Sequence, residues 1–231
     1  MFTSLSGSTF LRGLALTICA AAAPSWAGSY GELVDLYRDW RAFEEPPTLD
    51  GAPDYTAARF ARAYEQFPGF RERLEAIDTS EWSTAEQVDW HIVRAEMNGF
   101  DFNHRVLQPW VRDPAFYQSI WTHRSDVPAH EGPTHHAVVE LWTYSFPLSS
   151  SEQQRMVKEL AVIPPLMRQA RDNLTGNARD LWVAGIRDIR AQLDNLGRIR
   201  QMSGDNASLK LLSAVEDAEA ATAELLGWLE A

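Results

Sequence analysis

Residues 83–98, STAEQVDWHIVRAEMN, decide the fold, because they carry both the start signal and the period of a long helix. Ser83 and Glu86 form a capping box, in which the serine oxygen accepts from the backbone NH of Glu86 and the glutamate carboxylate reaches back to the cap. Two apolar stripes follow at helical spacing, which predicts a largely buried helix. The stripes are Val88, Ile92, Ala95, Gly99, Phe102 and Val106, and beside them Val93, Met97, Phe100 and Leu107.

The same helical period continues on both sides of this stretch, whereas no strand-like alternation of useful length occurs. Apolar residues from Leu33 to Phe43 predict a helix that Pro46 and Pro47 end, and a second helical stretch begins near Asp54 and breaks at Pro68. Further helices are predicted over 150–174, divided at the proline pair 164–165, over 182–196 and over 211–229. The predicted fold class is all-α, a multi-helix bundle or array.

The period fails from residue 109 to about 135, where prolines, glycines and aromatic residues gather before a short predicted helix, HAVVELWTYSF. This segment holds Trp110, Phe116, Tyr117 and Trp121. Long aromatic loops often line binding sites, so the segment is a candidate peptide-binding surface from Trp110 to Trp142. The alternative is that the rings close the end of a helical bundle.

The N-terminus predicts export. Arg12 precedes a short apolar run, and Ser25 and Ala27 provide a small-residue cleavage site, so residues 1–27 are predicted to be a signal peptide removed after Ala27. The mature chain would be periplasmic or secreted. The alternative to a cleaved signal peptide is a lipid anchor on Cys19. The lipid-anchoring motif requires a small residue before the cysteine, but this chain has Ile18 there. Cys19 is the single cysteine, so the mature chain would contain no thiol.

Length and charge limit the classes of function. The mature chain, residues 28–231, is long enough for one helical domain and contains no apolar run that could span a membrane. Removal of Arg12 leaves 20 basic against 32 acidic side chains, a net charge of −12. Such a chain would repel phosphate backbones, so a nucleic acid is not an expected partner.

The stretch AHEGPTHH, residues 129–136, superficially resembles a zinc motif. In HExxH, histidines four residues apart lie on one side of a helix. His130, Glu131 and His135 form HExxxH instead, and five residues turn a helix by about 500°, so the two rings would diverge by roughly 140°. A loop could still gather His130, His135 and His136, but no metal ligand is predicted here.

Other candidate residues also receive structural interpretations. His91 and His104 lie thirteen residues apart without a second ligand at metal spacing, and both are predicted to be hydrogen-bonded histidines of a helical bundle. Glu44 and Glu45 are interpreted as solvated. The final LLGWLEA crowds four large apolar side chains at an uncapped helix end, which predicts an exposed apolar patch. These four side chains are Leu225, Leu226, Trp228 and Leu229.

Several segments together resemble a known bacterial family. These are ELVDLYRDWRAFEEPP, STAEQVDWHIVRAEMN, DPAFY and above all LAVIPPLMRQARDNLT. From about residue 30 to its end, the chain resembles the N-terminal portion of the exported proteins grouped as domain of unknown function eight-eight-five. The resemblance implies a helical scaffold whose full-length relatives look like zinc metallopeptidases, with an HExxPGHxxQ metal motif.

That motif lies downstream of the matched region, so the resemblance assigns no catalytic residue and no zinc ligand to this chain. Whether the chain is an enzyme stays open, and alone it is expected to be inactive. Two hypotheses follow. It is the N-terminal helical part of an exported metallopeptidase-like protein whose partner is a C-terminal half, with zinc only in the full-length form. Alternatively, it is a complete non-catalytic periplasmic module that binds a peptide.

Overall fold

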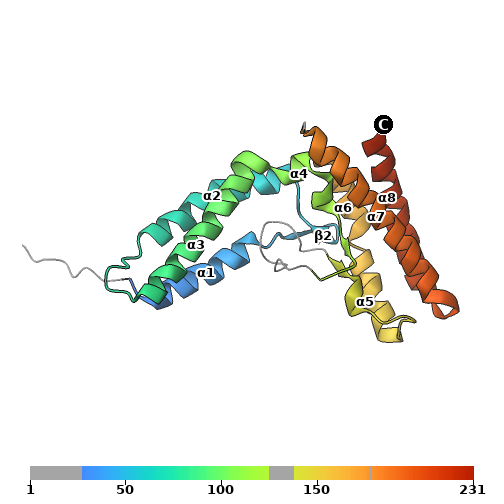
Figure 1. Cartoon of the computed structure of the whole chain (residues 1–231), viewed down its shortest axis with the longest axis horizontal. Helices are drawn as coiled ribbons and strands as arrows, with labels where there is room; N and C mark the ends of the chain where they lie inside the picture. The colour runs from blue at the N-terminus through green and yellow to red at the C-terminus, as the bar shows by residue number, and fades with distance from the viewer. Residues whose placement is uncertain (1–27, 125–137, 177) are drawn as a thin grey trace, which may run out of the picture.

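The computed structural model describes residues 28–124, 138–176 and 178–231, and over these ranges the fold is all-α, as the sequence predicts (Figure 1). The helices are α1 (Tyr30–Glu44), α2 (Ala57–Glu75), α3 (Thr84–Phe102), α4 (Pro109–Arg112), α5 (Ser150–Leu160), α6 (Ile163–Asn173), α7 (Arg179–Ser203) and α8 (Leu209–Glu230). Two pairs of short strands lie in the loops. β1 (Thr48–Leu49) pairs with β2 (Ala52–Pro53) in antiparallel orientation, and β3 (Ile120–Trp121) pairs with β4 (Val139–Glu140) in parallel orientation.

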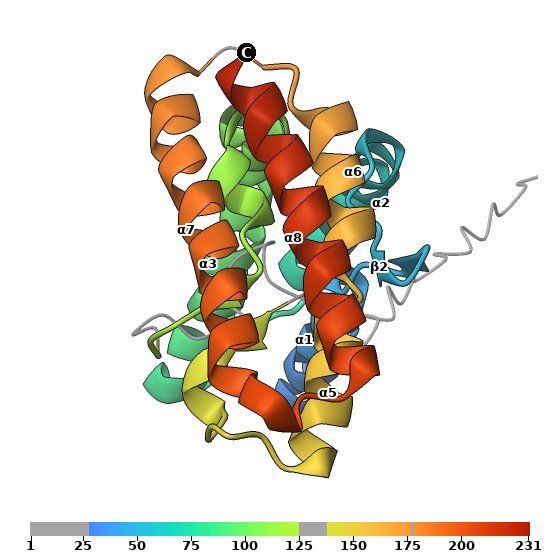
Figure 2. The ribbon, with the colours of Figure 1, turned by 90° about the vertical axis from the view of Figure 1, so that its right-hand side faces the viewer.

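The helices form two lobes that meet at an angle, one built from α1, α2 and α3 and the other from α4 to α8 (Figures 1 and 2). Each lobe has its own buried apolar cluster, centred on Trp40 in the first and on the α6, α7 and α8 side chains in the second. Ring contacts join the clusters: His104 lies 5.7 Å from Phe60 of the second cluster and 3.9 Å from Phe100 of the first, between ring centroids. The single domain proposed for residues 28–231 stays a prediction.

Helix starts follow local sequence closely. Capping boxes begin α1 at Ser29, α3 at Ser83 and α5 at Ser149, each with a glutamate three residues later. The predicted division near the proline pair 164–165 is confirmed, because α5 ends at Leu160 and α6 begins at Ile163 with both prolines in its first turn. The predicted break at Pro68 is wrong, because α2 continues through it. Pro68 is exposed, so water can satisfy the carbonyl that loses its helical donor.

The prediction that α3 is largely buried is also wrong. Val93, Met97 and Phe100 pack into the first cluster, but the neighbouring stripe faces outward. Val88 is 50% exposed and Ile92 53% exposed. The reason lies in the tertiary arrangement, because α1 and α2 are the neighbours of α3 in this lobe and cover one side of it.

The described part of the aromatic segment, residues 109–124, contains short helices where the sequence predicts an irregular chain. A π-helix (Asn103–Leu107) extends α3, and a 3-10 helix (Pro114–Tyr117) follows α4. The helix predicted over 136–146 is wrong: the described part forms β4 and a 3-10 turn (Leu141–Thr143). Residues 125–137 lie outside the described part of the chain.

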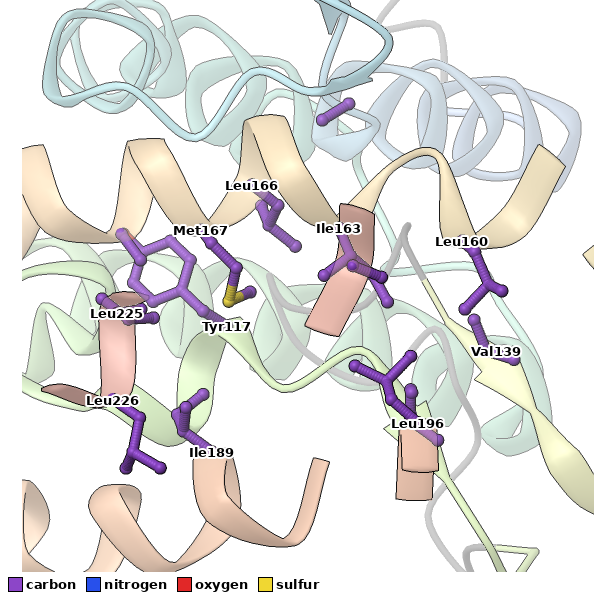
Figure 3. Packing of buried hydrophobic residues seen from close by; sticks show 14 of the residues in the cluster. Tyr117, Val139, Leu160, Ile163, Leu166, Met167, Ile189, Leu196, Leu225 and Leu226 are labelled. Atoms are coloured by element: carbon purple, nitrogen blue, oxygen red, sulfur yellow. The ribbon is translucent and has the colours of Figure 1, made fainter. Parts of the chain in front are cut away.

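The end of α8 does not expose the patch predicted for it. Leu225, Leu226 and Leu229 are buried in the second lobe, and Figure 3 shows the first two of them in the core. Trp182 of α7 donates from its indole Nε1 to the carbonyl of Leu229 at 3.1 Å and lies 5.8 Å from the Trp228 ring. The last two turns of α8 are therefore anchored within the chain, and the short α7–α8 turn lets the two helices pack along their length (Figure 2).

Candidate functional site

The metal-like stretch 129–136 lies outside the described residues, so the structure does not place His130, Glu131, His135 or His136. Among the residues that the structure describes, no three histidine, cysteine, aspartate or glutamate side chains converge as a metal site would require. The absence of zinc ligands from this chain stays a prediction.

Three of the described rings of the aromatic segment lie in the core, whereas Trp121 is half-buried and Trp142 is 37% exposed. Trp110, Phe116 and Tyr117 are buried, and the Tyr117 ring lies among α6, α7 and α8 side chains (Figure 3). The hypothesis that these rings bind a peptide is therefore wrong for the three buried residues. Burial of large rings at the junction of α4, α6 and α7 explains their clustering in the sequence.

Buried amides of α6 hold this segment and the α1–α2 loop in place. Asn173 donates from Nδ2 to the carbonyl of Tyr55 and, at 2.8 Å, to the Tyr117 hydroxyl oxygen. The Tyr117 hydroxyl in turn donates to the Trp110 carbonyl at 2.7 Å. Gln169 accepts from the Tyr55 backbone NH at 2.7 Å and donates to Pro53. These contacts give loop backbone groups the partners that burial demands.

The exposed stripe of α3 is the first candidate site. It comprises Val88, Ile92, Ala95, Gly99, Phe102 and Val106, and is called the α3 face below. Its positions alternate steps of four and three, the spacing with which one helix packs along another. Ala95 and Gly99 make the middle of the face flat, and a Cβ built on Gly99 meets no atom within 4 Å. A second helix could therefore approach the α3 face closely.

A small cavity at the junction of the two lobes is the second candidate site. Its volume is about 20 Å³, and its wall contains side chains from both clusters. The lining residues are Glu44, Pro46, Asp54, Tyr55, Arg59, Phe60, Ala63, Phe100 and His104. We call it the junction cavity. It joins the end of α1, the start of α2 and the π-helix after α3.

Glu44 is the charged group most altered by this environment. Its side chain is 12% exposed and accepts from Nη1 of Arg41 at 2.7 Å, and Arg41 also lies 3.7 Å from Glu96. Burial raises the pKa of Glu44 to about 7; Arg41 opposes this rise and Glu96 adds to it. A carboxyl that titrates near neutrality can bind or release a proton, so the interpretation of Glu44 as solvated is wrong.

His104 is buried beside the same cavity. Its Nδ1 lies 2.9 Å from the carbonyl oxygen of Phe100, one helical turn earlier, which confirms the prediction of a hydrogen-bonded bundle histidine. Burial lowers the pKa of His104, which favours the neutral ring. His91, in contrast, is exposed on α3 and packs against Trp90, with ring centroids 5.0 Å apart, and its prediction as a hydrogen-bonded residue stays a prediction.

Composition and spacing could not indicate the junction cavity, because its residues are far apart in the sequence. One local signal was available for Glu44. A carboxylate in the last turn of a helix faces the negative end of the helix dipole, which is unfavourable for its charged form. Glu45, the C-cap residue directly before Pro46, faces the same end of the dipole but is exposed, so this signal alone does not distinguish the two glutamates.

An open groove of about 510 Å³ lies between the α5–α6 junction and the start of α8. Its lining includes Val157, Pro164, Leu209, Lys210 and Asp217. Leu209 is 85% exposed. The groove has no buried polar group to select a ligand, so its chemistry is less specific than that of the junction cavity.

Comparisons with known proteins give the fold but not the function. No family model and no curated protein matches the sequence. A solved structure described as "a putative lipoprotein of unknown function from Shewanella oneidensis" is similar in fold, with a TM-score of 0.57 and 13% sequence identity. The match covers 88% of this chain and 37% of that chain, so this chain spans little more than a third of that neighbour. No helix in the described residues is long and apolar enough to cross a membrane.

Proposed function

We propose that this chain is a helical scaffold of a larger exported protein and acts by holding another polypeptide segment. The occupant is a helix encoded downstream of Ala231, and it packs on the α3 face. The observation that carries the proposal is this face itself, because exposed large apolar side chains at helix-packing spacing mark a surface that a partner covers.

The dimensions of the α3 face suit one helix. From Val88 to Phe102, within α3, it extends roughly 21 Å at 1.5 Å per residue, about four turns of a helix. Phe102 is 48% exposed and Val106 40% exposed, so the face remains apolar at its C-terminal end. This end of α3 and the C-terminal end of α8 lie toward the same edge of the molecule (Figures 1 and 2), which favours a downstream segment as occupant.

Two further observations favour a larger protein. The match to the similar structure from Shewanella oneidensis covers only 37% of that neighbour's chain. The resemblance to the family of domain of unknown function eight-eight-five implies a downstream half with a zinc motif. In this proposal, zinc and the peptidase-like chemistry belong to that half, and the present chain supplies no catalytic residue.

Export completes the proposal. Cleavage after Ala27 would make Gly28 the first residue of the mature chain, and Gly28 is buried, with its carbonyl accepting from Nε1 of Trp82 at 2.7 Å. The proposed first residue of the mature chain is therefore packed against the first lobe. Intact mass of the exported product tests this: a mature N-terminus at Gly28 supports it, whereas retention of residues 1–27 or a lipid on Cys19 contradicts it.

The reading frame beyond codon 231 tests the scaffold proposal. In-frame continuation into an HExxPGH motif supports the peptidase-like scaffold. A stop codon directly after Ala231 would overturn it and leave the alternative, a complete binding module. The open groove beside α8 is then the surface where such a module would hold a peptide, because Trp110, Phe116 and Tyr117 of the aromatic segment are buried.

A further inference from the structure

The open groove beside α8 contains a row of four side chains from that helix. Lys210, Ser213, Ala214 and Asp217 all line the groove, and each charged residue lies three and four residues from the two small ones, which places all four on one face of α8. Both charged residues are exposed. Apart from Leu209, the remaining lining comes from α5, α6 and the link between them, namely Val157, Ala161 and Pro164. The groove therefore combines apolar side chains with a helix face that is basic at its start and acidic two turns later.

The two charges of this face have no ionic partner within the described ranges. Lys210 and Asp217 are about 10 Å apart along the helix at 1.5 Å per residue, which is too far for them to pair with each other. Lys210 also lies in the first turn of α8, where the positive end of the helix dipole disfavours a cation. Opposite charges supplied from outside the chain would therefore stabilise this face.

We propose that the groove is a contact between two copies of this chain, whose α8 helices pack antiparallel across a twofold axis. Lys210 and Asp217 lie at equal distances on either side of the midpoint between Ser213 and Ala214. An antiparallel pair centred at this midpoint places each Lys210 opposite the partner's Asp217, so symmetry creates two ion pairs. A parallel pair in register would place like charges opposite each other, which is unfavourable.

The shape of the groove also suits a second α8. Ser213 and Ala214 are small, so two helix backbones can approach closely at the centre of the contact. Leu209 is 85% exposed at the end of the groove, and a second copy would cover it together with the apolar side chains of α5 and α6. The outer side of α8 faces the viewer in Figure 2, with α5 and α6 beside it, so another molecule can reach it.

The contact involves only about two turns of α8 and the groove beside it, which places it at the small end of protein interfaces. We therefore expect a transient dimer with a dissociation constant in the micromolar range. The dimer uses a surface different from the α3 face and does not depend on the proposed scaffold function.

Sedimentation equilibrium of the exported chain tests the dimer. At about 0.15 M salt, repulsion between two acidic chains is screened beyond about 8 Å. Lys210→Asp should weaken dimerisation at least about tenfold, because symmetry repeats the reversed charge at both ends of the contact. The double variant Lys210→Asp/Asp217→Lys exchanges the two charges and should return the dissociation constant to within about threefold of the wild-type value.

Arg187→Asp, at an exposed position of α7 outside the groove, is the matched control. It changes the net charge as Lys210→Asp does, and should leave the dissociation constant within about twofold of the wild-type value. Circular dichroism confirms that each variant is folded. A wild-type chain that stays monomeric up to about 1 mM would overturn the inference. So would a dimer that Lys210→Asp leaves unchanged or that the double variant does not restore.

Discussion

At the scale of single residues, Glu44 links the fold to pH. In the folded chain the Glu44 carboxyl keeps its proton up to about pH 7, because burial penalises the charged form. In the unfolded chain the same carboxyl releases its proton near pH 4.5. Between these pH values the folded state binds more protons than the unfolded state. The free energy of unfolding due to Glu44 therefore falls as the pH rises from 4.5 to about 7, and stays low above that.

A Glu44→Gln variant should remove this loss of stability. The interval from 4.5 to about 7, at about 1.4 kcal/mol per pH unit, corresponds to about 3 kcal/mol. At pH 8 the free energy of unfolding of the variant should therefore exceed that of the wild type by up to this amount. At pH 4.5 the difference should be small. Urea unfolding at both pH values measures it. Glu45→Gln, at the exposed neighbouring position, is the control, and equal pH profiles for both variants would contradict the prediction.

The buried hydrogen bonds of Asn173 also stabilise the fold through a single residue. Its amide is buried and donates to the Tyr55 carbonyl and the Tyr117 hydroxyl oxygen, so Asn173→Ala leaves two buried acceptors without this donor. We expect the free energy of unfolding to fall by about 1–3 kcal/mol for each acceptor left unsatisfied. Gln201→Ala, on an exposed position of α7, should change it by less than about 0.5 kcal/mol. Equal effects in chemical denaturation would argue against the buried network.

At the scale of elements, local sequence predicts most helices but not their surroundings. The capping boxes at Ser83 and Ser149 and the proline pair 164–165 act within a few residues, so periodicity and capping rules predict them. The outward direction of Val88 and Ile92 depends on where α1 and α2 pack, which no local pattern contains. The junction cavity was not predicted for the same reason, since Glu44 and His104 meet only through the fold.

Gly185 lies where α7 closely approaches the 3-10 helix Pro114–Tyr117. A Cβ at this position of α7 would lie 2.7 Å from the Pro114 side chain and 2.8 Å from the backbone N of Ala115. Gly185→Ala should therefore lower the melting temperature, although alanine favours helices by about 1 kcal/mol. Gly69→Ala in α2 is the matched control, because a Cβ there meets nothing within 4 Å, and it should raise the melting temperature. A stabilising Gly185→Ala would show that the two elements are less tightly packed.

At the scale of the whole molecule, the proposed scaffold has its zinc in a downstream half and none in this chain. Residues 28–231, purified and dialysed, should retain less than stoichiometric zinc, because HExxxH replaces HExxH and the mature chain has no thiol. Elemental analysis decides the question. One zinc per chain that is lost in His130→Ala or His135→Ala would show that residues 129–136 form a metal site after all.

The most direct test of the scaffold proposal is the dissociation constant between this chain and the downstream polypeptide produced separately. Burying an isoleucine contributes about 1.5–3 kcal/mol, so Ile92→Glu on the α3 face should weaken binding at least about tenfold. Leu209→Glu, an equally drastic change on the exposed start of α8, should leave the dissociation constant within about twofold. Calorimetry that finds both variants equal to the wild type, or no binding by the wild-type chain, would contradict the assignment of the α3 face.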